Sequence, residues 1–106
     1  MAISIKNPKE ISALQIPNRV VAQSLDLAQK SAKEGMSLKE LDSIIEDFIL
    51  SCGAKPSFKG LYGFPCAVCI SVNEVIIHGI PTDYRLKSGD IVGVDIGAEY
   101  NGWFGD

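Results

Sequence analysis

The apolar residues of the first third of the chain recur every three or four positions, with charged and amide side chains between them. This period places one apolar stripe along a helix, so the pattern predicts an amphipathic helix from Pro8 onward. Asn7 can cap this helix, proline suits its first position, and Glu10 completes a capping box. The stripe comprises Ile11, Leu14, Ile16, Val20, Val21, Leu25, Leu27 and Ala28.

Pro17 lies inside this first helix. A proline there removes a backbone hydrogen bond and clashes with the preceding turn, so we expect a kink or a break near residues 14–16. Gly35 should end the helix, because glycine readily adopts the left-handed conformation that follows a helix C-terminus.

A second amphipathic helix should run from Ser37 toward Gly53. Ser37 and Glu40 form another capping box, and the apolar stripe that follows keeps the helical period. The stripe comprises Leu38, Leu41, Ile44, Ile45, Phe48 and Ile49. Because two successive helices with one apolar face each need a sheet to cover, we expect an α+β arrangement within the broad α/β class.

The remaining half of the chain has the pattern of loops and short strands. Residues 55–65 are rich in proline, glycine and aromatic side chains and have no period, which predicts an apolar loop. The aromatic side chains of such a loop could equally wall a pocket or fold back on the core. Strands are expected at residues 67–72 and 91–99, with a turn at residues 73 and 74.

Asn101 and Gly102 are the strongest turn signal in the chain. Asn-Gly between two strand-like runs predicts a two-residue type I′ hairpin, which needs positive φ at both positions. In the register set by this turn, Asp106 falls opposite Gly97 and shares a face with Asp95. The two carboxylates would be diagonal neighbours, with backbones about 7–8 Å apart.

Asp95 and Asp106 would repel each other at this separation unless a shared proton or a cation lies between them. Carboxylates from adjacent strands can hold divalent ions, and two-metal hydrolase sites need their ions about 3.5–4 Å apart. Asp95 also interrupts an apolar strand, where a carboxylate is costly to bury without a partner. We therefore favour a metal site over an ordinary solvated hairpin face.

The composition of the chain is that of a single domain. With 106 residues, 46% hydrophobic residues and a formal net charge of −3, the chain can bury a modest core. No stripe of Lys and Arg with interleaved aromatic residues supports nucleic-acid binding. No apolar segment is long enough to span a membrane, and the first residues lack the features of a signal peptide. We therefore expect a cytoplasmic protein, monomeric when intact.

Cys66 and Cys69 have the Cys-x-x-Cys spacing of redox and zinc sites. Three cysteines form an odd set, which favours reduced thiols over a disulfide framework. In a strand, residues three apart point to opposite faces, so these thiols could not jointly hold a metal without distortion. We favour packing of small residues, with Cys69 beside a pocket.

His78 is the only histidine of the chain. A lone histidine after an apolar run is more often packed and hydrogen-bonded than catalytic. Gly79 and Pro81 follow it, however, and mark a sharp bend that could aim one imidazole in a fixed direction. In that position it could donate a hydrogen bond to a carbonyl or to a developing charge.

Three segments together resemble the type I methionine aminopeptidases, in the bacterial form without an amino-terminal extension. They are residues 71–81 (SVNEVIIHGIP), 89–95 (GDIVGVD) and 101–106 (NGWFGD). The resemblance implies the pita-bread fold, in which two similar halves surround a curved, largely antiparallel sheet. Residues 1–106 would be the amino-terminal half of this one catalytic domain, with the carboxy-terminal half absent.

The resemblance also implies an activity. Enzymes of this family remove the initiator methionine from nascent polypeptides whose second residue is small, by attack of a metal-activated hydroxide on the first peptide bond. The implied cofactors are two divalent ions, which Co, Mn, Fe or Zn can supply with such ligands, and a monovalent cation. The ribosome is a candidate partner, whereas neither a nucleic acid nor a membrane is expected.

Particular residues of this chain match the functional positions of the family. By resemblance, Asp95 is a terminal ligand of one metal ion, and Asp106 bridges both ions. His78 would hydrogen-bond the substrate and stabilise the tetrahedral intermediate. The backbone carbonyls of Asn73 and Val75 can hold the monovalent cation. The wall of the methionine pocket matches Phe58, Leu61, Tyr62, Phe64 and Cys69.

The resemblance also shows which ligands are missing. The family needs a further His and two Glu ligands from its second half, so we expect residues 1–106 alone to bind metal weakly, expose apolar surface and be inactive. The main rival is a non-catalytic relative, a pita-bread module that binds peptides or proteins. A second alternative is a thiol redox module, which would need a low thiol pKa. A third is a proline-specific peptidase, because such enzymes share the same fold.

Overall fold

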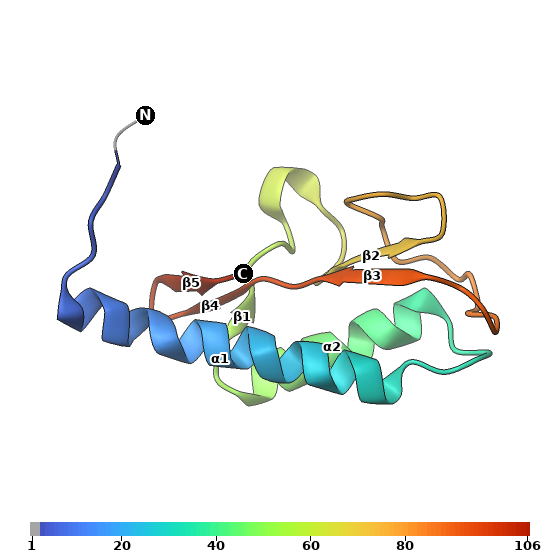
Figure 1. Cartoon of the computed structure of the whole chain (residues 1–106), viewed down its shortest axis with the longest axis horizontal. Helices are drawn as coiled ribbons and strands as arrows, with labels where there is room; N and C mark the ends of the chain where they lie inside the picture. Colours follow the sequence, from blue (N-terminus) through green and yellow to red (C-terminus); the bar gives the residue numbers. More distant parts are fainter. Residues whose placement is uncertain (1–2) are drawn as a thin grey trace.

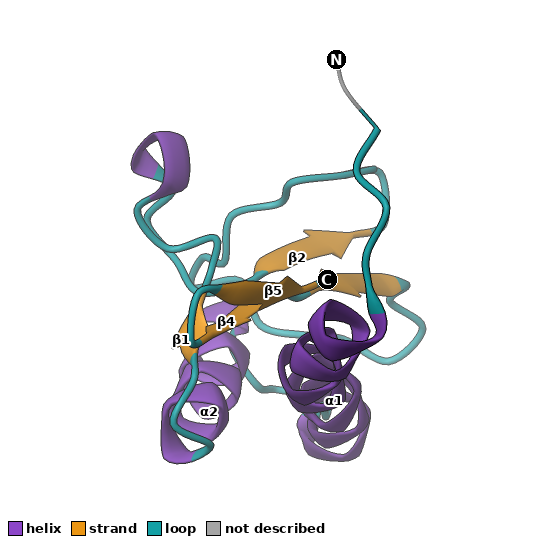
Figure 2. Ribbon diagram, turned by 90° about the vertical axis from the view of Figure 1, so that its left-hand side faces the viewer, coloured by secondary structure: helices purple, strands orange, loops and turns teal. Residues whose placement is uncertain are grey.

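Two helices form one layer of the molecule, and short antiparallel strands lie in a second layer beside them (Figure 1). The structure is a computed structural model that describes residues 3–106. Figure 2 shows both helices on one side of the strands, while the loops that flank strand β2 (Cys69–Val72) project from the opposite side. The expected arrangement of two amphipathic helices packed on antiparallel sheet is therefore confirmed. No helix of the described residues is long and apolar enough to cross a membrane.

Helix α1 spans Pro8–Ser31 and begins as the sequence predicts. The Asn7 side chain accepts a hydrogen bond from the Glu10 backbone at 2.8 Å, and the Glu10 carboxylate accepts one from the Asn7 backbone at 2.9 Å. The predicted break near residues 14–16 is wrong, because the helix continues through Pro17. Tertiary packing explains this result, since the Pro17 side chain is buried and the Pro17 carbonyl lies against strand β5 (Trp103–Gly105). The helix ends at Ser31, so Gly35 does not end it.

Helix α2 spans Leu38–Ser51 and supplies the centre of the core. Leu41, Ile45 and Ile49 of its apolar stripe have no exposed surface. The Ser37 hydroxyl accepts a hydrogen bond from the Glu40 backbone at 3.1 Å, as expected of an N-cap. The Glu40 carboxylate lies 3.9 Å from Arg85 instead of completing the predicted capping box. The second helix is therefore confirmed, with a simpler cap.

The strands form two small antiparallel sheets. One has the order β1-β4-β5, and the other pairs β2 with β3. The strands are β1 Lys55–Pro56, β2 Cys69–Val72, β3 Val92–Asp95, β4 Ala98–Tyr100 and β5 Trp103–Gly105. The hairpin between β4 and β5 has φ of 50° at Asn101 and 81° at Gly102, with Tyr100 opposite Trp103. This confirms the predicted turn and its register.

The predicted strand at residues 91–99 proves to be two strands in different sheets, β3 and β4. Between them, the Gly97 carbonyl accepts a hydrogen bond from the Ser57 backbone at 3.1 Å, which joins the β4 sheet to the loop after β1. The strand predicted from residue 67 begins only at Cys69. The predicted loop at residues 55–65 contains β1 and a short 3₁₀ helix, Leu61–Gly63.

Candidate active site

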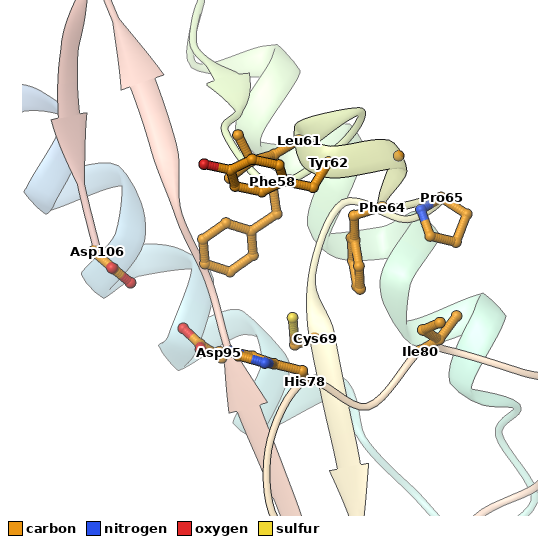
Figure 3. A pocket seen from close by; sticks show the side chains of 11 residues that line it. Phe58, Leu61, Tyr62, Phe64, Pro65, Cys69, His78, Ile80, Asp95 and Asp106 are labelled. Atoms are coloured by element: carbon orange, nitrogen blue, oxygen red, sulfur yellow. The ribbon is translucent and has the colours of Figure 1, made fainter.

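A pocket of about 580 Å³ opens among the loops and strand ends on the side of the sheets away from the helices (Figure 3). Five separate parts of the chain form it: the loop after β1, the start of β2, the segment from His78 to Ile80, the end of β3, and the residue after β5. Its lining comprises Phe58, Leu61, Tyr62, Gly63, Phe64, Pro65, Cys69, His78, Ile80, Asp95 and Asp106. Every side chain that the sequence assigned to metal or substrate binding therefore lies in this one pocket.

The two carboxylates enter the pocket from the ends of two strands that belong to different sheets. Asp95 ends β3 and lies directly opposite Cys69 of β2. Residues opposite each other in an antiparallel pair share a face, so both side chains reach the pocket. Asp106 follows β5, and its backbone N–H donates to the Asn18 side chain of α1 at 3.3 Å. Figure 3 shows both carboxylate groups directed at the same space.

The cost of burying a carboxylate does not apply to Asp95. Asp95 and Asp106 are both exposed, so water can solvate their carboxylates. Their placement carries no large desolvation cost, and no buried partner is needed to explain it. What remains in favour of a metal site is the convergence of two oxygen donors, the ligand type that hard divalent ions prefer.

His78 reaches the pocket from a constrained turn. Its φ of 56° is in the left-handed region, which costs most residues about 1–2 kcal/mol and in which His is tolerated better than most. The next residue, Gly79, donates its N–H to the Ser71 hydroxyl at 3.0 Å and accepts from the Ile70 backbone at 2.9 Å. A side chain at Gly79 would overlap the Ile70 carbonyl. The predicted rigid bend after His78 is therefore present.

The apolar wall of the pocket comes from the loop between β1 and β2. Tyr62 is fully exposed and Leu61 is 53% exposed, whereas Phe58 and Phe64 are half-buried. An ion pair of 2.8 Å between Lys59 and Glu46 of α2 holds the base of this loop. The sequence left open whether this loop lines a pocket or folds back on the core. Phe58, Leu61, Tyr62 and Phe64 all line the pocket.

Asp42 supports the site and was missed in the sequence. Its carboxylate is buried and accepts hydrogen bonds from the Ala67 and Val68 backbones at 3.0 and 2.9 Å. These bonds hold the chain just before β2, which explains why the strand begins at Cys69. Burial raises the pKa of the Asp42 carboxyl, and the two backbone bonds only partly oppose this rise. The sequence did contain a signal for this role, because Asp42 lies on the apolar stripe of α2 between Leu38 and Ile45, where a carboxylate needs a partner.

A second polar cluster fixes the turn after β2. Asn73 has a φ of 53°, and its side chain donates to the Asp90 carboxylate at 3.0 Å and accepts from the Ile91 backbone at 3.0 Å. The Tyr84 hydroxyl donates to the same carboxylate at 2.8 Å. The hydrogen bond from Asn73 is the main reason that the pKa of Asp90 is lowered. Asn73 and Val75 lie outside the pocket, and their cation site stays a prediction.

The cysteines do not have the environment of a redox pair. Cys66 precedes β2 and Cys69 begins it, so the two cysteines do not lie in one strand. Burial raises the pKa of both thiols, whereas a reactive dithiol needs a lowered pKa. Both cysteines are free, and Cys69 lines the pocket as expected. The redox interpretation is therefore disfavoured.

The fit of the pocket to a metal ion is partial. Within residues 3–106, no group of three or more His, Cys, Asp and Glu side chains is placed to hold a metal ion. Asp95 and Asp106 supply two oxygen donors, which suits a divalent ion but leaves most of its coordination positions to other ligands. Two carboxylates alone would give a weak site.

Comparison with known proteins identifies the family. The model of metallopeptidase family M24 matches residues 12–106. This chain belongs to metallopeptidase family M24. It is 58% identical over 106 residues to a methionine aminopeptidase of Helicobacter pylori, covering 100% of this chain and 42% of that protein. It is 43% identical over 108 residues to the methionine aminopeptidase of Escherichia coli K12, covering 100% of this chain and 41% of that protein.

Solved structures of similar proteins share the fold. Methionine aminopeptidase from Rickettsia prowazekii superposes with a TM-score of 0.94 at 33% identity, over 97% of this chain and 42% of that one. Prolidase from Pyrococcus furiosus superposes with a TM-score of 0.78 at 27% identity, over 92% of this chain and 27% of that one. The predicted pita-bread fold and the bacterial type I resemblance are confirmed. The chain spans about two fifths of the length of these methionine aminopeptidases.

Proposed function

We propose that the protein containing this M24 chain removes amino-terminal methionine from polypeptides by metal-dependent hydrolysis. The observation that carries the proposal is the meeting of Asp95, Asp106 and His78 in one pocket that also has an apolar wall. The resemblance supports this activity, and membership of a metallopeptidase family implies divalent metal cofactors. The similarity to methionine aminopeptidases favours methionine over other amino-terminal residues.

Asp95 and Asp106 would hold the metal ions, with Asp106 shared between two of them. Bound divalent ions supply a water molecule that is activated near neutral pH, and they polarise the scissile carbonyl. Co, Mn, Fe and Zn all accept ligands of this kind. The remaining ligands, one His and two Glu, would come from the part of the relatives' length that this chain does not cover.

His78 would act on the substrate directly. Its imidazole reaches the pocket that contains both carboxylates, and it can donate a hydrogen bond near neutral pH. A donor aimed at the oxygen that gains charge as the amide carbon becomes tetrahedral lowers the barrier. The constrained turn supports this role, because a donor that is already oriented needs no reorganisation during the reaction.

The apolar wall would receive the methionine side chain. Phe58, Leu61 and Phe64 give it an apolar lining, while the carboxylates lie at the other side of the pocket. An unbranched, polarisable thioether adapts well to aromatic and aliphatic surroundings. We further propose a small second residue in the substrate, a cytoplasmic location and a monomeric intact protein, with the ribosome as a candidate partner.

The non-catalytic alternative is weaker. A peptide-binding relative has no use for the two carboxylates, and this chain retains both Asp95 and Asp106 in the pocket. Proline-specific hydrolysis is also less well supported, because the prolidase similarity is at 27% identity while methionine aminopeptidases reach 58%.

The test is release of methionine from Met-Ala-Ser by the full-length protein with added Co²⁺ or Mn²⁺. Asp95→Asn should lower kcat/KM by about 100-fold or more, because it removes a ligand charge. Asp26→Asn is the matched control, since within residues 3–106 Asp26 pairs only with Lys30 on the exposed face of α1, and the substitution should leave activity unchanged. Failure of the folded, metal-loaded protein to release methionine would overturn the proposal.

A further inference from the structure

Ser71 lies directly behind the turn that carries His78. It is 8% exposed and sits two residues after Cys69 in β2. Because side chains alternate along a strand, Ser71 faces the same side of the sheet as Cys69. It does not line the pocket, since the turn that carries His78 and Gly79 lies between. Its hydroxyl is therefore beneath the site without touching a substrate there.

The Ser71 hydroxyl provides one of the two attachments of Gly79 to β2. It accepts from the Gly79 N–H at 3.0 Å, while the Gly79 carbonyl accepts from the Ile70 backbone at 2.9 Å. Gly79 is buried, so its N–H has no water to replace a lost acceptor. The hydrogen bond from the Ile70 backbone can form with any residue at position 71. The hydrogen bond from the Gly79 N–H, in contrast, needs the hydroxyl oxygen of Ser71.

His78 depends on these attachments. No hydrogen bond in the described part of the chain involves His78 itself. Its left-handed backbone, with φ of 56°, is a conformation that the residue would leave if its neighbours released it. The direction of the imidazole consequently depends on the position of Gly79, which the two hydrogen bonds to β2 fix.

We infer that Ser71 is a positioning residue for His78: its hydroxyl fixes the Gly79 amide and thereby aims the imidazole into the pocket. The catalytic consequence of this role rests on the proposed aminopeptidase function, but the structural consequence does not. A loss of the hydroxyl should free the turn without unfolding the sheet, because β2 keeps its pairing with β3.

The structural consequence is tested in the 106-residue chain by NMR, since its one histidine gives a single set of imidazole signals. Ser71→Ala should raise the hydrogen-exchange rate of the Gly79 amide at least about tenfold and move the His78 backbone shifts toward random-coil values. Ser71→Thr should retain both signatures, because it keeps the oxygen and faces Gly93, which has no side chain in its way.

Ser24→Ala is the matched control for removal of a buried serine hydroxyl. Ser24 is fully buried in α1, where its hydroxyl donates to the Val20 carbonyl at 2.7 Å. It should leave the Gly79 and His78 signals unchanged. Unchanged signals in a folded Ser71→Ala chain would overturn the inference, as would equal changes in the Ser24→Ala chain.

The catalytic consequence is tested by a double-mutant cycle in the full-length protein. Ser71→Ala should lower kcat about tenfold with little change in KM, and Ser71→Thr should restore it. In a His78→Ala background, Ser71→Ala should have no further effect. Equal losses in both backgrounds would show that Ser71 acts on general structure and not through His78. A wild-type protein without activity would refute the aminopeptidase function alone, because the NMR result would still decide the positioning role.

Discussion

The two sides of the sheets are stabilised in different ways. On the helix side, Leu41, Ile45 and Ile49 have no exposed surface and pack into a continuous apolar core. On the pocket side, Tyr62 and Asp95 are open to solvent. Burial of apolar area holds the first side, whereas hydrogen bonds between distant segments hold the second.

Three polar side chains provide attachments on the pocket side. Asp42 holds the chain before β2, Ser71 holds the turn that carries His78, and Asn73 holds the turn after β2. The bonds of Asp42 and Asn73 join residues 25 and 17 positions apart, whereas that of Ser71 joins residues 8 positions apart. The comparison teaches that the core and the site geometry are held by different kinds of contact, although Asp42 contributes to both stability and site geometry.

The largest effect on stability should come from the helix side. Ile45→Ala should lower the free energy of unfolding by about 2–5 kcal/mol, because it leaves a cavity where no surface is exposed. Leu61→Ala on the pocket wall removes a similar side chain that is 53% exposed, and should cost less than about 1 kcal/mol. Urea unfolding followed by circular dichroism measures both. Equal losses would contradict the separation of the two sides.

Asp42→Ala should lower the free energy of unfolding by about 2–3 kcal/mol, somewhat less than Ile45→Ala, because the Ala67 and Val68 N–H groups lose their acceptor. Both bonds go to the same carboxylate oxygen, which an amide can replace. Asp42→Asn should therefore lose far less stability than Asp42→Ala. Urea unfolding of the two variants decides this point, and an Asn variant as unstable as the Ala variant would show that the charge matters more than the acceptor.

Gly105→Ala should destabilise the junction of α1 and β5 by about 1–3 kcal/mol, because an added Cβ would overlap the Pro17 carbonyl. Gly93→Ala is the matched control in β3, since its Cβ would make only an ordinary contact at 3.7 Å with the Ser71 carbonyl. Thermal unfolding compares them. A Gly105→Ala variant as stable as Gly93→Ala would mean that α1 does not pack this closely on β5.

The smallest effect should be a dependence of stability on pH. Burial raises the pKa of Asp42 in the folded chain above its ordinary value of 3.8, which applies in the unfolded chain. At a pH between the unfolded and the folded pKa, the folded chain therefore binds more protons than the unfolded chain. The contribution of Asp42 to stability therefore falls as pH rises through this window. Asp42→Asn removes the fall, whereas Asp90, with a lowered pKa, acts equally in both proteins.

Urea midpoints of the wild-type and Asp42→Asn chains, measured from about pH 3.5 to 7, test this dependence. The wild-type chain should lose stability relative to the variant as pH rises. A constant difference, or a gain by the wild-type chain, would contradict the raised pKa.

The elements that the sequence predicts well depend on neighbouring residues. The capping box of Asn7 and Glu10 and the hairpin turn at Asn101 and Gly102 are chemistry within a few positions. The apolar stripe of α2 is equally local, because it needs only the helical period. These features are present as expected, since nothing distant competes with them.

The features that the sequence did not predict depend on distant partners. Pro17 stays helical because it packs on β5, and residues 91–99 divide because Gly97 is bonded to Ser57. Asp42 binds backbone groups more than twenty residues away. No periodic pattern reports such contacts. For the site, the register indicated the two carboxylates, but the apolar wall was assigned by resemblance, because its loop has no period.

The central claim is that Asp95 and Asp106 together bind a divalent ion in the pocket that contains His78. Paramagnetic broadening of amide signals by Mn²⁺, titrated into the 106-residue chain, tests it most directly. We predict broadening centred on Asp95 and Asp106 that extends to His78 and Cys69, and that disappears in Asp95→Ala. Broadening centred on other exposed acidic residues, or broadening that persists unchanged in Asp95→Ala, would contradict the account.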